Sequence, residues 1–280
     1  MVSPLVSADW LKDNLNLVKI LDATYHLTGV DRDPEADFAA SRIPGANRFD
    51  INKVADTNNP LPHMLPDAET FATAVAAMGI SDHDHVIVYD DSAIMPATRA
   101  WWMFRLFGHE RISVLDGGLA AWRRINGPLD TDAHKTPIPG NFTVRPSIGA
   151  QVIDMAAIEA MMAADSLGQL ADARSASRFS GEAPEPRAGL RSGHIPGASN
   201  VPLSTLVSED GTFRSPEEIS AAFRDGGIDP EQPIITSCGS GVTACGLALG
   251  LALIGNEKIF VYDGSWTEWG GSEAPIETGT

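Results

Sequence analysis

The strongest constraint on the fold is that the sequence repeats itself at a nearly constant distance. Four short motifs recur in the same order, with offsets between 147 and 152 positions. The pairs are 22–23 with 172–173 (Asp-Ala), 43–46 with 195–198 (Ile-Pro-Gly-Ala), 116–118 with 263–265 (Asp-Gly-Gly and Asp-Gly-Ser) and 122 with 269 (Trp). A repeat of this length is too long for a solenoid, and it indicates two copies of one domain in tandem.

The boundary between the copies is expected where regular structure is interrupted. Pro137, Pro139, Gly140 and Pro146 interrupt the stretch around 130–150, in which polar residues dominate. We therefore expect an N-terminal domain over 1–135, a linker over 136–150 and a C-terminal domain over 151–280.

Short apolar runs at matching places in the two copies predict strands. They cover 18–21, 86–89 and 112–115 in the first copy, and 169–171, 233–236 and 259–262 in the second. Helical patterns lie between them. This alternation favours an α/β class in which each copy contains a mainly parallel sheet flanked by helices.

Two helix starts are readable from capping residues. Asp67 is expected to begin a helix that places Phe71, Val75 and Met78 on one face. Residues 215–218 (Ser-Pro-Glu-Glu) predict a second helix, because Ser followed three residues later by Glu forms a capping box and Pro suits the first turn.

The charge balance excludes some classes of partner. The chain has 20 Lys and Arg against 37 Asp and Glu, a formal net charge of −17. Such a field repels phosphate backbones and anionic lipid surfaces, so we expect neither nucleic acid nor membranes as partners. An anionic small-molecule substrate would require a local cluster of Arg.

Other features argue against a membrane location and against bound metals. The sequence has no stretch of about 20 apolar residues and no signal-peptide pattern at its start, from which we expect a cytoplasmic protein. Cys238 and Cys245 are the only cysteines, too few for a disulfide framework or a multi-cysteine zinc site, and the seven His show no ligand spacing. We therefore expect neither a metal nor another cofactor.

Cys238 lies where a strand gives way to a helix. Gly239 and Gly241 allow a tight loop with its amides turned inward, and the apolar stretch 245–254 is typical of a buried helix. The inward amides and the helix dipole both favour a thiolate over a thiol, so Cys238 is a candidate nucleophile. Cys245 lies within the apolar stretch and is interpreted as a core residue. A disulfide between the two cysteines would require the loop to unwind.

Residues 238–244 (Cys-Gly-Ser-Gly-Val-Thr-Ala) resemble the active-site loop of the 3-mercaptopyruvate sulfurtransferases, which are tandem-domain members of the rhodanese superfamily. Residues 60–66, 193–198 and 262–269 extend the resemblance over nearly the whole chain. It implies two rhodanese domains with one active site, carried by the C-terminal domain. The active-site loop that it implies comprises Gly239, Ser240, Gly241, Val242, Thr243 and Ala244.

The first copy lacks the nucleophile. Aligning 86–89 with 234–237 puts Asp90 opposite Cys238, so the N-terminal domain is expected to be structural.

The resemblance also implies how a substrate is held. Arg178 and Arg187 correspond to the family's ligands for the carboxylate and ketone of the substrate, whereas Arg174 could form an internal ion pair and Arg191 is interpreted as a surface charge. Relatives that use thiosulfate tend to carry basic residues after the cysteine, where this chain has Gly239 and Ser240. We therefore expect 3-mercaptopyruvate as the donor, with thiosulfate as the alternative.

The expected reaction transfers sulfur through Cys238. Its thiolate takes the sulfur of 3-mercaptopyruvate as a persulfide and releases pyruvate, after which cyanide or a thiol acceptor, for example thioredoxin, removes the outer sulfur. The family's proposed Ser-His-acid triad corresponds to Ser240, His63 and Asn52, where Asn cannot supply the acid and Asp50 or Asp56 could replace it. The alternative for His63 is a local structural hydrogen bond.

Two rival classes remain for comparison. A cysteine phosphatase requires Arg six residues after the cysteine, and this chain has Ala244 there. A non-catalytic rhodanese binding module is the other rival; intact Cys238, Arg178 and Arg187 argue against it.

Overall fold

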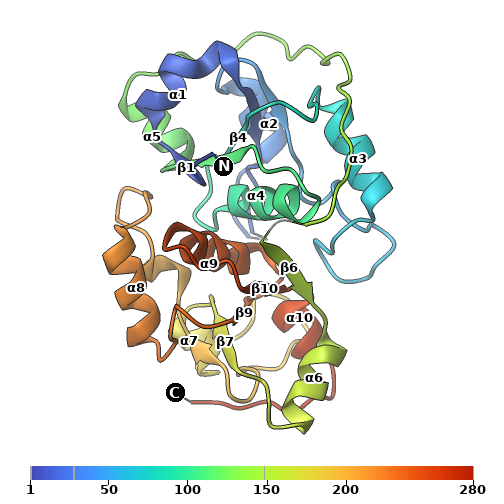
Figure 1. Ribbon diagram of the computed structural model, residues 1–280, viewed down its shortest axis with the longest axis vertical. Coiled ribbons are helices and arrows are strands. Elements are labelled where there is room, and N and C mark those ends of the chain that lie inside the picture. Colours follow the sequence, from blue (N-terminus) through green and yellow to red (C-terminus); the bar gives the residue numbers. More distant parts are fainter. Residues whose placement is uncertain (1, 28, 148, 280) are drawn as a thin grey trace. The chain divides into compact units, whose positions relative to one another are not determined.

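The computed structural model describes residues 2–27, 29–147 and 149–279, and its chain forms two compact units (Figure 1). Unit 1 comprises the described residues of Met1–Thr57, Leu65–Ile148 and Glu209–Phe213. Unit 2 comprises Asn58–Met64, Gly149–Ser208 and the described residues of Arg214–Thr280. Each unit therefore includes a short segment that the repeat pattern had assigned to the other copy.

Unit 1 contains one five-stranded parallel sheet with the order β1-β5-β4-β2-β3. Its strands are β1 (Leu5–Val6), β2 (Lys19–Asp22), β3 (Ala46–Arg48), β4 (Val86–Tyr89) and β5 (Ile112–Leu115). Its helices are α1 (Ala8–Asn14), the 3-10 helix η1 (Leu15–Leu17), α2 (Pro34–Ala40), α3 (Ala68–Ala77), α4 (Pro96–Leu106) and α5 (Gly118–Arg124).

Unit 2 repeats this topology, with a second five-stranded parallel sheet in the order β6-β10-β9-β7-β8. Its strands are β6 (Ala150–Ile153), β7 (Gln169–Asp172), β8 (Ser199–Asn200), β9 (Ile234–Ser237) and β10 (Ile259–Tyr262). Its helices are α6 (Met155–Ala163), α7 (Ala176–Phe179), the 3-10 helix η2 (Leu203–Thr205), α8 (Pro216–Asp225), α9 (Val242–Leu253) and α10 (Ser265–Trp269). The expected α/β class, with a mainly parallel sheet in each copy, is confirmed.

The central strands form where the sequence concentrates buried β-branched residues. Every residue of β4 and of β9 is buried, because helices cover both faces of such a sheet. The carboxyl ends of parallel strands meet at one edge, which is where ligands bind in open α/β sheets. In unit 2 this edge gathers the loops that follow β7, β9 and β10.

The expected helix caps are confirmed. Asp67 accepts a hydrogen bond from the Thr70 amide at 2.7 Å, and Ser215 forms the capping box with Glu218. Phe71 and Val75 are buried as expected, whereas Met78 is partly buried and follows α3 as its C-cap, with its amide still bonded to the Ala74 carbonyl.

No helix in the described parts of the chain is long and apolar enough to cross a membrane.

Candidate active site

Cys238 follows β9 directly and is 2% exposed. The loop ends at Gly241, which has a left-handed φ of 75° and serves as the N-cap of α9. Only glycine adopts this conformation without a steric cost from Cβ. The expected loop boundary is therefore wrong by three residues, because Val242, Thr243 and Ala244 form the first turn of α9 and bring its amide end to the cysteine.

The start of α10 holds the amides of the cysteine loop. Ser265 Oγ accepts hydrogen bonds from the amides of Cys238 and Gly241, each at 3.2 Å, and donates its own proton to the Tyr262 carbonyl at 2.7 Å. The expectation that the loop amides all turn inward is thus wrong for these two. Gly239 and Ser240 supply the loop amides between them, and Ser240 is 8% exposed.

The carbonyls of the loop are held from the same element. The Trp266 amide donates to the Cys238 carbonyl at 2.9 Å. The amide and hydroxyl of Thr267 both donate to the Gly239 carbonyl, at 2.9 and 2.6 Å. Ser265 and Thr267 were not predicted from the sequence, although residues 116–118 and 263–265 differ at their third position.

Cys245 is a core residue, as expected. It is fully buried in α9, and its thiol donates to the Gly241 carbonyl at 3.1 Å. Neither Cys238 nor Cys245 forms a disulfide.

Arg178 lies against the cysteine loop. A Cβ placed on Gly239 would come 3.0 Å from Arg178 Nη2, so the guanidinium occupies the space that a side chain at 239 would need. Its Nε and Nη2 donate to the two carboxylate oxygens of Glu185, at 3.1 and 2.5 Å. The side chain of Arg178 is 23% exposed, whereas that of Glu185 is 2% exposed. Within the described parts of the chain, the contacts of the Arg178 guanidinium with Glu185 involve Nε and Nη2 and not Nη1.

Arg174 forms the expected internal ion pair. Its side chain is fully buried, contacts both carboxylate oxygens of Asp172 and lies 4.4 Å from the ring centroid of Trp266. Its Nη1 also donates to Glu185 at 2.9 Å. Glu185 therefore joins a structural arginine to the predicted substrate arginine Arg178.

Arg187 lies beside His63, with Nη2 3.4 Å from the imidazole Nε2. His63 is 6% exposed and has a left-handed φ of 62°, which a non-glycine residue adopts only when its surroundings impose it. Both residues belong to unit 2.

Arg191 is not the free surface charge that was expected. Its Nε donates to the Gly270 carbonyl at 3.2 Å and its Nη2 to the Trp269 carbonyl at 3.1 Å, and it thereby caps the end of α10.

Asn52 and Asp50 are candidates for the third position of a triad with Ser240 and His63. Asn52 is exposed, and its backbone amide donates to Asp50 Oδ1 at 2.9 Å. Asp50 also forms an ion pair with Lys53 at 3.4 Å. These contacts assign Asp50 a local role in its own turn.

Asp90 occupies the place in unit 1 that Cys238 occupies in unit 2. It follows β4 as Cys238 follows β9. Its carboxylate accepts the amides of Ala97 at 2.8 Å and Ser92 at 3.4 Å. Burial nevertheless raises the pKa of Asp90 to about 7, because these two hydrogen bonds only partly offset the loss of hydration.

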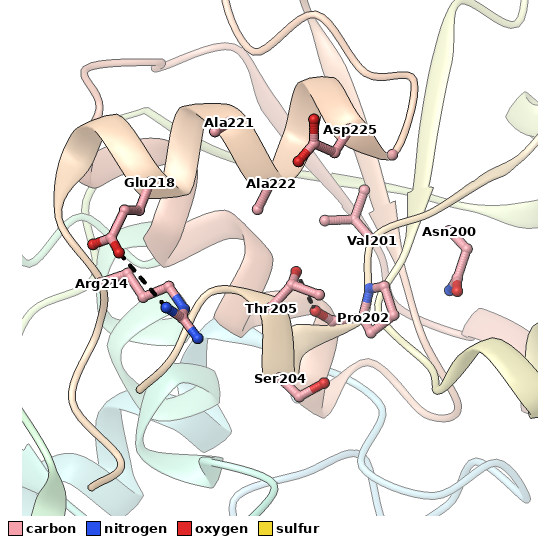
Figure 2. A pocket seen from close by; sticks show the side chains of 11 residues that line it. Asn200, Val201, Pro202, Ser204, Thr205, Arg214, Glu218, Ala221, Ala222 and Asp225 are labelled. Carbon is pink, nitrogen blue, oxygen red and sulfur yellow. Dashed lines mark hydrogen bonds and ion pairs between the residues drawn. The ribbon is translucent and has the colours of Figure 1, made fainter. Parts of the chain in front are cut away.

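Two observations limit other kinds of site. A separate hollow of about 570 Å³ lies between α8 and residues 200–205, and none of the predicted site residues lines it (Figure 2). Among the described residues, no group of three or more His, Cys, Asp or Glu is arranged to hold a metal ion.

The two parallel sheets of equal topology define a tandem α/β fold made of two copies of one domain, and the family comparison agrees with this duplication. The model of the Rhodanese-like domain matches residues 7–125 and 154–272, so the chain belongs to the rhodanese family.

Particular relatives are similar over nearly the whole chain. The 3-mercaptopyruvate sulfurtransferase of Escherichia coli (strain K12) is 42% identical over 278 residues, covering 97% of both proteins. The thiosulfate sulfurtransferase of Cricetulus griseus is 38% identical over 283 residues, covering 98% of this chain and 94% of the relative. A crystal structure of SseA from Escherichia coli, described as a 3-mercaptopyruvate sulfotransferase, has a TM-score of 0.84 and 40% identity, covering 95% of this chain and 99% of that one.

Proposed function

We propose that the protein is a sulfurtransferase that takes sulfur from 3-mercaptopyruvate, carries it on Cys238 and passes it to a thiol acceptor. The observation that carries the proposal is the position of Arg178, whose guanidinium lies against Gly239 in the cysteine loop. The similarity to 3-mercaptopyruvate sulfurtransferases over nearly the full chain supports the same activity.

In the first half of the proposed reaction, the Cys238 thiolate attacks the thiol sulfur of 3-mercaptopyruvate. A sulfur–sulfur bond forms, the carbon–sulfur bond breaks, and its electron pair moves to the carbon as the enolate of pyruvate. The enolate takes up one proton and leaves as pyruvate. Cys238 then carries a persulfide next to the first turn of α9, whose amide end favours an anion.

In the second half, an acceptor thiolate attacks the outer sulfur. The bond to Sγ breaks, the acceptor becomes a persulfide and Cys238 returns to the thiolate, so no external oxidant or reductant is required. Thioredoxin is our proposed physiological acceptor, and cyanide would serve in an assay. Donor and acceptor visit one site in turn, which predicts ping-pong kinetics.

The two arginines are proposed to bind the donor's carboxylate and ketone. Arg178 already shares its charge with Glu185, but its Nη1 can still donate. Arg187 lies next to His63, with Nη2 3.4 Å from Nε2, and its guanidinium has further N–H groups with which it can pair with a carboxylate. We propose that His63 and Ser240 supply the proton for the enolate.

The loop favours a donor whose charge lies away from the transferred sulfur. Gly239 and Ser240 place no cation directly after the cysteine, whereas thiosulfate carries its two charges close to that sulfur. Thiosulfate is the alternative donor, since the chain also resembles a thiosulfate sulfurtransferase.

The experiment that tests the proposed donor is a comparison of kcat/KM for 3-mercaptopyruvate and thiosulfate on the same preparation. We expect the value for 3-mercaptopyruvate to be at least tenfold higher, a preference of about 1.4 kcal/mol. A preference for thiosulfate would establish the alternative. No turnover with either donor would favour a non-catalytic binding module.

The proposed location is the cytoplasm. Two cysteines that form no disulfide suit a reducing compartment, and cell fractionation would check this location.

A further inference from the structure

We propose that Ser265 is a positioning residue that fixes the cysteine loop in the shape that accepts sulfur. The inference rests on the proposed function, because it assigns a task within the same site. Ser265 does not act on the donor in this account; it acts through the backbone of the loop.

The geometry gives one hydroxyl three hydrogen bonds. Ser265 is fully buried, accepts the amides at both ends of the loop, Cys238 and Gly241, and donates to the Tyr262 carbonyl. A hydroxyl has one proton to donate and two lone pairs to accept, so every hydrogen-bonding position of Ser265 is in use. The hydroxyl therefore ties the strand end of the loop to its helix end.

The backbone conformation at Ser265 is unfavourable for a residue with a side chain. Its φ of 51° is left-handed, a conformation that costs a non-glycine residue about 1 kcal/mol. Glycine would avoid that cost at this position. The three hydrogen bonds of the hydroxyl offset it.

The first copy of the domain provides an internal control. Its equivalent residue is Gly118, with a similar φ of 55°, at the start of α5. The main-chain contact is preserved, because the Leu119 amide donates to the Asp90 carbonyl at 2.8 Å as the Trp266 amide does to Cys238. The fold therefore forms this junction without a hydroxyl, and the hydroxyl is found in the copy that carries the cysteine.

The consequence for chemistry concerns the direction of the loop dipoles. Trp266 and Thr267 donate hydrogen bonds to the carbonyls of Cys238 and Gly239, so the partial negative charges of these two oxygens are directed toward α10. With both ends of the loop tied by Ser265, the amides of Gly239 and Ser240 are left to stabilise a sulfur anion. Fixed donors that need no reorganisation are the most effective stabilisers of developing charge.

The test is Ser265→Gly, which copies the residue of the first domain and removes the backbone cost. We expect kcat for 3-mercaptopyruvate to fall about 10- to 100-fold, the range for a misplaced reacting group, while KM changes less than twofold because both arginines are untouched. We also expect the alkylation rate of Cys238 by iodoacetamide to rise more steeply between pH 7 and pH 9 than in the unmodified protein. A purely structural role would not change that pH profile.

Two further variants keep the test decisive. Ser265→Ala removes the hydroxyl but retains Cβ, so it should show the same loss as Ser265→Gly. Ser272→Ala is the matched control. The Ser272 hydroxyl also accepts an amide hydrogen bond, from Ala274 at 3.1 Å, and donates to a carbonyl, that of Trp269 at 2.8 Å, but both partners lie outside the cysteine loop. The variant should leave kcat unchanged.

The outcomes separate the two proposals. If the unmodified protein transfers sulfur and both folded Ser265 variants retain its kcat and its alkylation profile, the positioning role is overturned and the proposed function stands. If the unmodified protein transfers no sulfur from either donor, the proposed function fails first. Circular dichroism and Tm establish that each variant is folded.

Discussion

At the scale of single residues, the carboxylate of Glu185 orients the guanidinium of Arg178. Its carboxylate is almost completely buried and is shared between Arg174 and Arg178. Arg174 is in turn held by Asp172, so the chain of ion pairs runs from the end of β7 to the cysteine loop. A long arginine side chain loses much rotamer freedom on binding, and a fixed carboxylate orders it in advance.

Glu185→Gln tests this role. One amide nitrogen would replace a carboxylate oxygen and face a guanidinium, so Arg178 should lose its fixed orientation. We expect KM for 3-mercaptopyruvate to rise about tenfold, kcat to change less, and the free energy of unfolding to fall by about 3 kcal/mol. Steady-state kinetics and urea unfolding are the measurements.

The matched control for that change is Glu231→Gln, which removes an exposed ion pair with Arg224 at 3.5 Å. It should alter neither KM nor stability appreciably. An unchanged KM in Glu185→Gln would show that Arg178 does not depend on Glu185.

At the scale of elements, β9, the cysteine loop and α9 form the unit of function. Gly239 has two consequences there: it leaves room for Arg178 and it places no charge beside the sulfur. A larger residue at 239 must displace the guanidinium, because its Cβ alone would stand 3.0 Å from Nη2.

The double variant Gly239→Arg with Ser240→Lys should therefore change donor preference. We expect kcat/KM for 3-mercaptopyruvate to fall. The ratio of kcat/KM for thiosulfate to kcat/KM for 3-mercaptopyruvate should rise about tenfold or more, because the two introduced cations would face the thiosulfate dianion. Ser240→Ala alone is the control that adds no charge. If the ratio stays constant, loop charge does not select the donor.

The sequence predicted the three central strands of each sheet, but not the edge strands β1, β3, β6 and β8 or the tertiary partners of the site residues. The strand β4 was placed correctly because a run of buried β-branched residues has few alternatives, and the boundary of β7 was missed by one residue. The start of α9 was placed three residues late, because Val242 to Ala244 carry no capping side chain. Ser265 was missed since its partners lie 24 and 27 positions away, a distance that no local pattern reports.

At the scale of the whole molecule, one fold occurs twice and only the second copy has a cysteine directly after its central strand. The first copy has Asp90 at that point, a carboxyl group that burial keeps partly protonated near neutral pH. Burying an ionised carboxylate costs free energy, so we expect the ionisation of Asp90 to destabilise the domain.

Asp90→Asn tests this assignment through the pH dependence of stability. The pKa of Asp90 is raised from 3.8 to about 7 on folding, so its favourable contribution is complete below about pH 4 and is lost as the pH rises through 7. Asn has no such titration. The stability of the variant relative to the unmodified protein should therefore increase between pH 5 and pH 8, by on the order of a few kcal/mol.

Urea unfolding at several pH values measures that difference. Parallel pH profiles for the two proteins would show that Asp90 is not titrating in this range. Sulfur transfer by Asp90→Asn should remain close to that of the unmodified protein.

The most direct test of the account is the mass of the peptide that holds Cys238 after incubation with 3-mercaptopyruvate and no acceptor. We predict a gain of one sulfur atom on that peptide and release of one equivalent of pyruvate. The gain should persist in Cys245→Ser, vanish in Cys238→Ser and reverse on addition of cyanide. An unmodified Cys238 peptide accompanied by pyruvate release would contradict the proposed persulfide.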